Sequence, residues 1–160
     1  MRLWHYELLP YLPDAQFKGQ LRELVAIMHD WRDKGKTNHL LINKVMEYDK
    51  AHLTSYFLRY RIEFQKRYHK EISYCKEFIS FADLKYGDDF TIDLTTGKIV
   101  SVRVKRYIFP DWHNKEYLRV CMANLYEKHF FGVGKSRITE EEWQRLLDGY
   151  KAITGEEYQI

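Results

Sequence analysis

Glu23 is the side chain whose setting in the sequence best suits proton transfer. It lies in residues 14–36, DAQFKGQLRELVAIMHDWRDKGK, where apolar residues recur at helical spacing. At 100° per residue from Phe17, Glu23 falls at about 240°, on a shoulder of the apolar stripe. Partial burial there would disfavour the charged carboxylate and raise its pKa, which suits a proton-transfer group. A solvated helix glutamate is the alternative, and the spacing leaves both interpretations open.

Two glutamines share this shoulder, since Gln16 falls at about 260° and Gln20 at about 300°. Arg22, at about 140°, is on the opposite shoulder. Asp14 is expected to cap the start of this helix, and Gly35 to end it in the left-handed conformation. We expect the apolar stripe to be buried; its members are Phe17, Leu21, Leu24, Met28 and Trp31.

The opening residues, MRLWHYELLPYLP, place a tryptophan, a histidine and a tyrosine close to the α-amine. Chain termini ordinarily fray, and ordering one must offset the conformational entropy that is lost. We therefore expect Trp4, Tyr6 and Leu8 to anchor this segment, as core residues and as a mount for the terminus. A signal peptide is not expected, because His5, Glu7 and two prolines interrupt the apolar run.

The composition indicates a globular chain with a basic first half. The 160 residues are 45% hydrophobic and 16% aromatic, which is enough for a core, and we expect one domain over 1–160. Residues 1–76 contain 14 Lys and Arg against 9 Asp and Glu, and residues 77–160 contain 12 against 14. Basic residues interleaved with aromatic ones suit a nucleic-acid surface. A solvated surface with a charge gradient is the other interpretation.

Cysteine and histidine spacing gives no sign of a metal site. Cys75 and Cys121 are far apart, no CxxC pair is present, and the histidines show neither HxH nor HxxxH spacing. We expect free thiols in a cytoplasmic protein that needs no metal or organic cofactor. No apolar segment is long enough to cross a bilayer, so no membrane association is expected. We also expect the protein to be a monomer.

Most of the remaining chain also carries helical patterns. Helices are predicted within residues 38–48, 49–72, 114–131 and 138–153, the last with a capping box formed by Thr139 and Glu142. Residues 88–106 alternate polar and apolar side chains around Thr96 and Gly97, which is typical of two short strands and a turn. The predicted fold class is mainly α: a compact helical single domain with a small β-hairpin-like insertion around residues 88–106.

Several of these segments together resemble the pyrimidine-dimer DNA glycosylase/AP lyase family, typified by a small phage repair enzyme. LPDAQFKGQLREL runs into the basic WRDKGK, so that Arg22-Glu23-Leu24 is followed by Gly35-Lys36. HLTSYFLRYRIEFQKR is similar to the family's long helix, which begins His-x-Thr. Similarity to the phage enzyme covers about residues 1–75, while MRLWH and EEEWQRLLDGYKAITGEEYQI are similar to bacterial relatives. No single motif is diagnostic; their order and spacing carry the resemblance.

The resemblance implies that the α-amine of Met1 is a nucleophile and that Glu23 is the essential carboxylate. An α-amine has a pKa of about 7.7–8.0, so about 10–15% is neutral at pH 7, whereas a lysine near 10.4 is almost entirely charged. A neutral amine is what attack on a sugar C1′ and formation of a Schiff base require. The resemblance also implies DNA contacts by Arg2, Gln16, Gln20, Arg22, Lys36 and His52.

The function implied is DNA repair, by a glycosylase with AP lyase activity on damaged pyrimidines in double-stranded DNA. The alternatives are a non-catalytic nucleic-acid-binding protein of the same fold and a protein-interaction module that uses the aromatic surface. Three departures from the phage enzyme leave the lesion open. Arg2 is too bulky for ordinary removal of Met1, the chain ends in acidic GEEYQI in place of a basic aromatic tail, and residues 80–110 have no counterpart.

Overall fold

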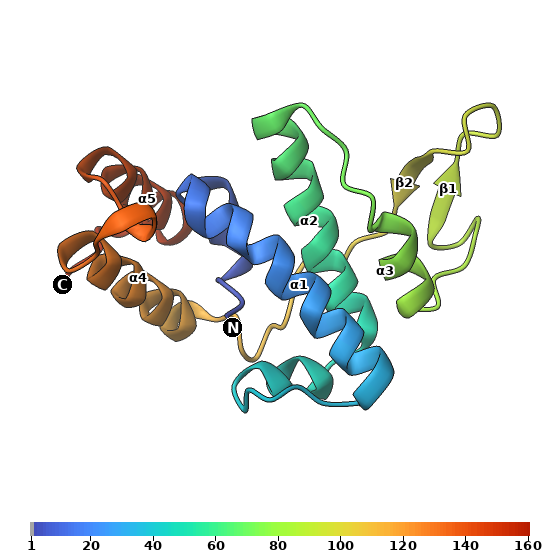
Figure 1. The fold of residues 1–160 in the computed structure, drawn as a ribbon, viewed down its shortest axis with the longest axis horizontal. Helices are drawn as coiled ribbons and strands as arrows, with labels where there is room; N and C mark the ends of the chain where they lie inside the picture. Colours follow the sequence, from blue (N-terminus) through green and yellow to red (C-terminus); the bar gives the residue numbers. More distant parts are fainter. Residues whose placement is uncertain (1) are drawn as a thin grey trace. The chain divides into compact units, whose positions relative to one another are not determined.

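The computed structural model describes residues 2–160, which fall into two compact units. The first unit joins the chain up to Leu24 with Pro110–Ile160, and the second is Val25–Phe109. Helix α1 (Asp14–Lys34) contributes its first part to one unit and its second part to the other (Figure 1). That residues 1–160 form one domain stays a prediction.

The first unit is helical. The 3-10 helix η1 (Tyr6–Tyr11) precedes α1, and the chain closes with α4 (Lys115–Phe130), the 3-10 helix η3 (Gly134–Ser136) and α5 (Glu140–Thr154). Helix α5 packs against both α4 and η1 (Figure 1). The predicted capping box is confirmed, because the side chains of Thr139 and Glu142 each accept a hydrogen bond from the other residue's N–H.

The contact between α5 and the N-terminal segment depends on a glycine. A Cβ at Gly149 would collide with the ring of Tyr11, so only a hydrogen atom fits between helix and ring. One turn earlier on α5, the Arg145 guanidinium donates to the Leu12 carbonyl oxygen at 2.7 Å. The N-terminal segment is therefore fixed to α5 just before α1 begins.

In the second unit, two helices meet at a stacked pair of aromatic rings. Helices α2 (Lys50–Tyr68) and α3 (Cys75–Phe81) pack on each other, and the rings of Phe57 and Phe78 stack between them with centres 4.1 Å apart. The Thr54 hydroxyl also donates to the Phe78 carbonyl oxygen at 3.2 Å, which joins the two helices by a buried hydrogen bond. The helical elements of this unit beyond α1 are η2 (Ile42–Glu47), α2 (Lys50–Tyr68) and α3 (Cys75–Phe81).

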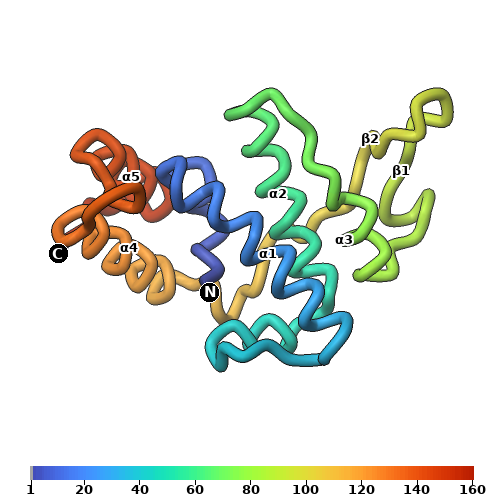
Figure 2. Tube along the Cα trace, in the orientation of Figure 1, coloured from blue at the N-terminus to red at the C-terminus, as the bar shows by residue number. Residues whose placement is uncertain are grey.

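A hairpin completes the second unit (Figure 2). Strands β1 (Phe90–Ile92) and β2 (Ile99–Val102) pair antiparallel, with a register shift after Thr91. Gly97 has φ +69° in the connecting turn, a conformation that glycine adopts without strain. The mainly α class with a small β insertion inside residues 88–106 is confirmed.

The structure departs from the predicted elements mainly at their ends. Asp14 is the first residue of α1 rather than its cap, and α2 ends at Tyr68 because His69 turns left-handed at φ +54°. The helix expected within 38–48 is only the 3-10 helix η2. Helix α3 is not predicted, because its seven residues are too few for a periodic pattern. None of the described helices is both long and apolar enough to span a bilayer.

The buried side of α1 is rotated from the predicted stripe towards the glutamine shoulder. Leu21 and Trp31 are only half-buried, whereas Gln16 and Gln20 are buried. The reason is that the N-terminal segment lies on that shoulder, where Gln20 hydrogen-bonds its backbone. Gly35 ends the helix with φ +69°, as predicted.

Candidate active site

A pocket of about 310 Å³ opens in the first unit between the N-terminal segment, the start of α1 and the end of α4. Its volume is at the lower end of the range for small-ligand pockets, about 300–1,000 Å³. Gln16 and Glu23 line it from α1, and Arg2 and Trp4 line it from the N-terminal segment. The remaining lining residues are Ala15, Gly19, Lys128 and Ser136.

The Glu23 carboxylate is bound to the backbone of the first residues. Its Oε2 accepts the Arg2 N–H at 3.0 Å and the Gln20 side-chain N–H at 3.2 Å. Partial burial raises the pKa of Glu23, and the hydrogen bond from Arg2 opposes that rise. The pocket therefore holds a carboxylate with a higher proton affinity than a solvated glutamate, which favours proton transfer near neutral pH.

Gln20 joins the N-terminal segment to α1 much as a neighbouring strand would. Its Oε1 accepts the Trp4 N–H at 2.9 Å, and its Nε2 donates to the Arg2 carbonyl oxygen at 2.7 Å. Gln20 is 1% exposed, so these bonds are shielded from water. It holds the backbone on both sides of Leu3 and also reaches Glu23; its contact with DNA stays a prediction.

Gln16 reaches from α1 to the loop after α4. Its Nε2 donates to the Ser136 carbonyl oxygen at 2.9 Å, while its Oε1 is buried and has no hydrogen-bond partner within residues 2–160. An unsatisfied buried polar atom costs about 1–3 kcal/mol. A hydrogen-bond donor on a molecule bound in the pocket would remove that cost.

The N-terminal segment is also held from α4. The Tyr117 hydroxyl donates to the Leu3 carbonyl oxygen at 2.5 Å, and burial raises the pKa of Tyr117, so the hydroxyl keeps its proton. The Arg2 guanidinium lies 4.9 Å from the centre of the Trp4 ring. Trp4, Tyr6 and Leu8 are buried, as predicted for core residues, and their role in holding the terminus stays a prediction.

Two buried histidines lie next to the same segment. His5 Nε2 donates to the His113 carbonyl oxygen at 2.9 Å, and its Nδ1 accepts the Glu7 N–H at 3.3 Å, which fixes its tautomer. Burial lowers the pKa of His5 to about 4 and the pKa of His113 well below 6.5. Cys121, whose sulfur accepts the His5 N–H at 3.4 Å, has its pKa raised by burial to about 11. Near pH 7 this cluster is therefore uncharged.

Three other predicted site residues do not line the pocket. Met1 lies outside the described residues. Arg22 is exposed on α1 and does not line the pocket, and Lys36 is exposed in the second unit. His52 stands near the start of α2, as predicted, and its Nδ1 accepts the Phe109 N–H at 3.1 Å in the second unit. DNA contacts by these residues stay predictions.

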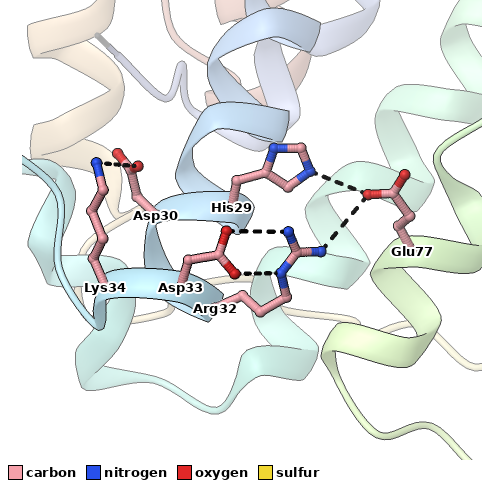
Figure 3. A network of polar contacts seen from close by, with 6 residues as sticks. All are labelled: His29, Asp30, Arg32, Asp33, Lys34 and Glu77. Carbon is pink, nitrogen blue, oxygen red and sulfur yellow. Dashed lines mark hydrogen bonds and ion pairs between the residues drawn. The ribbon is translucent and has the colours of Figure 1, made fainter.

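The basic stretch at the end of α1 is partly neutralised within the second unit (Figure 3). The Arg32 guanidinium donates to Asp33 at 2.8 Å and lies 4.0 Å from Glu77. Glu77 also contacts the His29 ring at 3.2 Å. These contacts reduce the positive charge that this stretch can offer to DNA phosphates, and Lys36 is not among the residues that make them (Figure 3).

Sequence reasoning missed Lys128 and Ser136, which complete the pocket. Ser136 is 120 residues from Gln16 along the chain, and no local pattern signals that the two meet. Gly19 does carry a local signal, because a glycine in a helix interior lowers stability by about 0.5–1 kcal/mol relative to alanine. A Cβ at Gly19 would meet nothing within 4 Å, so the bare backbone here widens the pocket.

The polar lining of the pocket suits an anionic ligand with hydrogen-bonding groups. Arg2 and Lys128 supply positive charge, and Gln16 supplies the unsatisfied amide oxygen. Glu23 is the carboxylate among the lining residues. Within residues 2–160, no three His, Cys, Asp or Glu side chains gather closely enough to hold a metal ion.

Comparison with known proteins identifies a family for the first part of the chain. Residues 1–75 match the model of the family described as pyrimidine dimer DNA glycosylase. The curated proteins and the solved structures gave no match. The matched range includes Gln16, Gln20 and Glu23, and it ends at Cys75, where α3 begins. The resemblance of this chain to the pyrimidine dimer DNA glycosylase family is thereby confirmed over residues 1–75.

Proposed function

We propose that this chain is a DNA glycosylase with AP lyase activity that acts on damaged pyrimidines in double-stranded DNA. One contact above all supports the proposal, the 3.0 Å hydrogen bond from the Arg2 N–H to Glu23 Oε2. The α-amine of Met1 is three covalent bonds from that nitrogen, and standard bond lengths keep atoms so connected within about 4 Å of each other. The hydrogen bond thus joins a carboxylate of raised pKa to the peptide group next to the proposed amine nucleophile.

In the proposed reaction, the neutral α-amine attacks C1′ of a damaged nucleotide that has left the base stack. The glycosidic bond breaks, and the base leaves with the bonding electron pair and takes up a proton. The nitrogen then loses one proton to a base. As the C1′–O4′ bond breaks and opens the sugar ring, its second proton ends on O4′, which gives an imine between the amine and C1′. Removal of a proton from C2′ then breaks the C3′–oxygen bond by β-elimination and cuts the strand. Water finally releases the sugar from the amine.

The pocket residues meet separate needs of this reaction. Glu23 stabilises the positive charge that develops on the sugar and carries protons to and from the reacting atoms. Arg2 and Lys128 pair with phosphates on either side of the lesion. Gln20 is a positioning residue, because it holds Arg2 and Glu23 together without lining the pocket.

Trapping with sodium borohydride on duplex DNA that contains one abasic site tests the proposal. Borohydride reduces the imine to a stable amine, so the wild-type protein should become covalently attached to the DNA, and peptide mapping should find the link on Met1. Acetylation of the α-amine should abolish the adduct, and Glu23→Gln should reduce it strongly. Lys66→Ala, an exposed change on α2, is the matched control and should leave the adduct unchanged.

If salt-sensitive DNA binding remains but no adduct forms with the wild-type protein, the non-catalytic nucleic-acid-binding alternative is correct. If the adduct does form, glycosylase assays on defined lesions identify the substrate: a cyclobutane dimer, an oxidised pyrimidine or a bare abasic site. The proposed enzyme acts in the cytoplasm as a monomer and without a cofactor. Sedimentation of the free protein checks the monomer, and activity in the presence of EDTA checks the cofactor.

A further inference from the structure

The last turn of α4 and the residues that follow it present an exposed aromatic and basic surface. We call this stretch, residues 128–137, the 128–137 loop. Phe130, Phe131 and Val133 are 64%, 73% and 81% exposed, although apolar side chains of this size are usually covered. The rings of Phe130 and Phe131 lie edge to face with centres 4.8 Å apart. The cations of the 128–137 loop are Lys128, Lys135 and Arg137; Glu127 precedes it, and Glu140, which follows it, lies 3.1 Å from the His129 ring.

The base of the 128–137 loop is braced. Gly132 packs on the end of α4 so closely that a Cβ would collide with the Lys128 carbonyl oxygen. The same oxygen accepts the Ile138 N–H at 3.3 Å, and the Ile138 carbonyl oxygen contacts the His129 ring at 2.9 Å. The two phenylalanines therefore project from a fixed turn, and little conformational entropy is lost when they bind.

The 128–137 loop adjoins the candidate active site. Lys128 and Ser136, near its two ends, line the same pocket as Glu23. The hydrogen bond from Gln16 to the Ser136 carbonyl oxygen fixes the far end of the loop to α1. The exposed rings therefore stand two and three residues along the chain from Lys128, a residue that lines the pocket.

We propose that the 128–137 loop is a wedge that enters the DNA beside the damaged nucleotide. Phe130 and Phe131 stack on the bases exposed when the nucleotide leaves, and Lys135 and Arg137 bind the adjacent phosphates. The two cations favour a polyanion over an apolar protein surface. The inference rests on the proposed function and adds a site beyond residues 1–75, the range that the family model matches.

Fluorescence of 2-aminopurine next to an uncleavable abasic analogue in duplex DNA tests the wedge. Binding of the wild-type protein should change the fluorescence, because a wedge alters the stacking of the reporter base. Phe130→Ser/Phe131→Ser should lose that change and bind the duplex about 5- to 100-fold more weakly. Val120→Ser, at a half-exposed apolar position on the same helix, is the control and should behave as wild type.

The phosphate contacts have a separate readout. Lys135→Ala/Arg137→Ala should lower the slope of log K against log salt concentration by about two, close to one for each lost phosphate contact. Arg119→Ala, which changes an exposed cation of α4 that does not line the pocket, should leave the slope unchanged. An unchanged slope in the double variant would overturn the assignment of these cations.

The wedge and the proposed function can fail separately. On single-stranded abasic DNA no base pair has to be opened, so the phenylalanine double variant should lose less of the borohydride adduct there than on duplex DNA. If wild type forms no adduct on any DNA, the proposed function fails, whereas the fluorescence still tests the wedge. If the double variant binds and unstacks duplex DNA like wild type, the wedge is wrong. If instead it changes only the sedimentation of the free protein, the surface is a protein interface and the wedge is equally wrong.

Discussion

The Tyr117 hydroxyl donates a hydrogen bond to the Leu3 carbonyl oxygen at 2.5 Å, although the two residues are 114 positions apart along the chain. On its other side, the same segment is held by Gln20, which bonds to the backbone of Arg2 and Trp4. The first residues are therefore fixed from α1 and from α4 together. Such mounting suits a terminus that must place a reactive group, since misplacement by about 1 Å can cost two orders of magnitude in rate.

Tyr117→Phe should loosen this mounting. The substitution leaves the buried Leu3 carbonyl oxygen without its donor from Tyr117, so we expect the free energy of unfolding to fall by about 1–3 kcal/mol. Urea unfolding measures the change, and borohydride trapping should show a slower reaction. Tyr107→Phe is the control, because the Tyr107 ring is 61% exposed and its loss of a hydroxyl should have little effect. Equal stability of wild type and Tyr117→Phe would contradict the argument.

Glu23→Gln should separate activity from stability. The amide keeps the size of the side chain but cannot act as a charged proton carrier, so we expect the rate to fall by about 10²-fold or more. The pKa of Glu23 is raised above its usual 4.5, mainly by burial, so the folded wild type binds more protons than the unfolded chain above pH 4.5. Wild type therefore loses stability relative to Glu23→Gln as the pH rises through that range. Urea unfolding of both proteins from pH 4.5 to 7.5 measures this difference, and a difference of the opposite sign would refute it.

The shoulder of α1 that carries Glu23 could be predicted from the sequence, because helical period is a local property. Gln16, Gln20 and Glu23 are within seven residues of each other, and angle arithmetic places them together. The sequence does not predict that the glutamines are buried, since amide side chains usually remain exposed. Gln20 is buried because the backbone of the N-terminal segment satisfies its amide, a contact that spans 16 residues in one case and 18 in the other.

The other wall of the pocket could not be predicted. Lys128 and Ser136 come from the end of α4 and the following turn, and no local pattern connects them to α1. The capping box of Thr139 and Glu142 and the turn at Gly97 could be predicted, because each depends only on near neighbours. The contacts that hold the first unit together, such as the hydrogen bond from Tyr117 to Leu3, join residues that are far apart in the chain, so local spacing does not predict them.

His5 should make the protein less stable in mild acid. The pKa of His5 falls from 6.5 to about 4 on folding because of burial. Below pH 6.5 the unfolded chain therefore binds a proton at His5 that the folded chain does not bind. The contribution of neutral His5 to the free energy of unfolding is complete above pH 6.5 and is lost as the pH falls towards 4. At 1.36 kcal/mol per pKa unit, this contribution amounts to about 3 kcal/mol. His113, whose pKa is also lowered by burial, acts in the same direction.

His5→Gln isolates this effect, because it removes the titrating ring at a position where an amide can still donate to the His113 carbonyl oxygen. Between pH 4.5 and 7, its free energy of unfolding should vary less steeply with pH than that of wild type. His69→Gln is the matched control, since His69 is exposed, and it should keep the wild-type slope. Equal slopes in wild type and His5→Gln would show that His5 does not titrate as the structure implies.

Gly19→Ala and Gly149→Ala should change stability in opposite directions, although both replace a glycine inside a helix. Alanine in a helix interior is favoured over glycine by about 0.5–1 kcal/mol. At Gly19 a Cβ meets nothing within 4 Å, so the free energy of unfolding should rise by about that amount. At Gly149 the Cβ collides with the ring of Tyr11, and overpacking of this kind costs about 1–3 kcal/mol, so the net effect should be a loss.

The same two variants also distinguish an effect on the pocket from an effect on the stability of the fold. Gly19 lines the pocket, so the added methyl group should slow borohydride trapping while the protein becomes more stable. Gly149 lies on α5 and does not line the pocket, so Gly149→Ala should slow trapping only to the extent that the N-terminal segment loosens. At a lower temperature, its trapping rate relative to wild type should therefore recover. Trapping and urea unfolding of the two variants at two temperatures distinguish these cases. If Gly19→Ala traps abasic DNA as fast as wild type, the space beside Gly19 is not used by the reacting nucleotide.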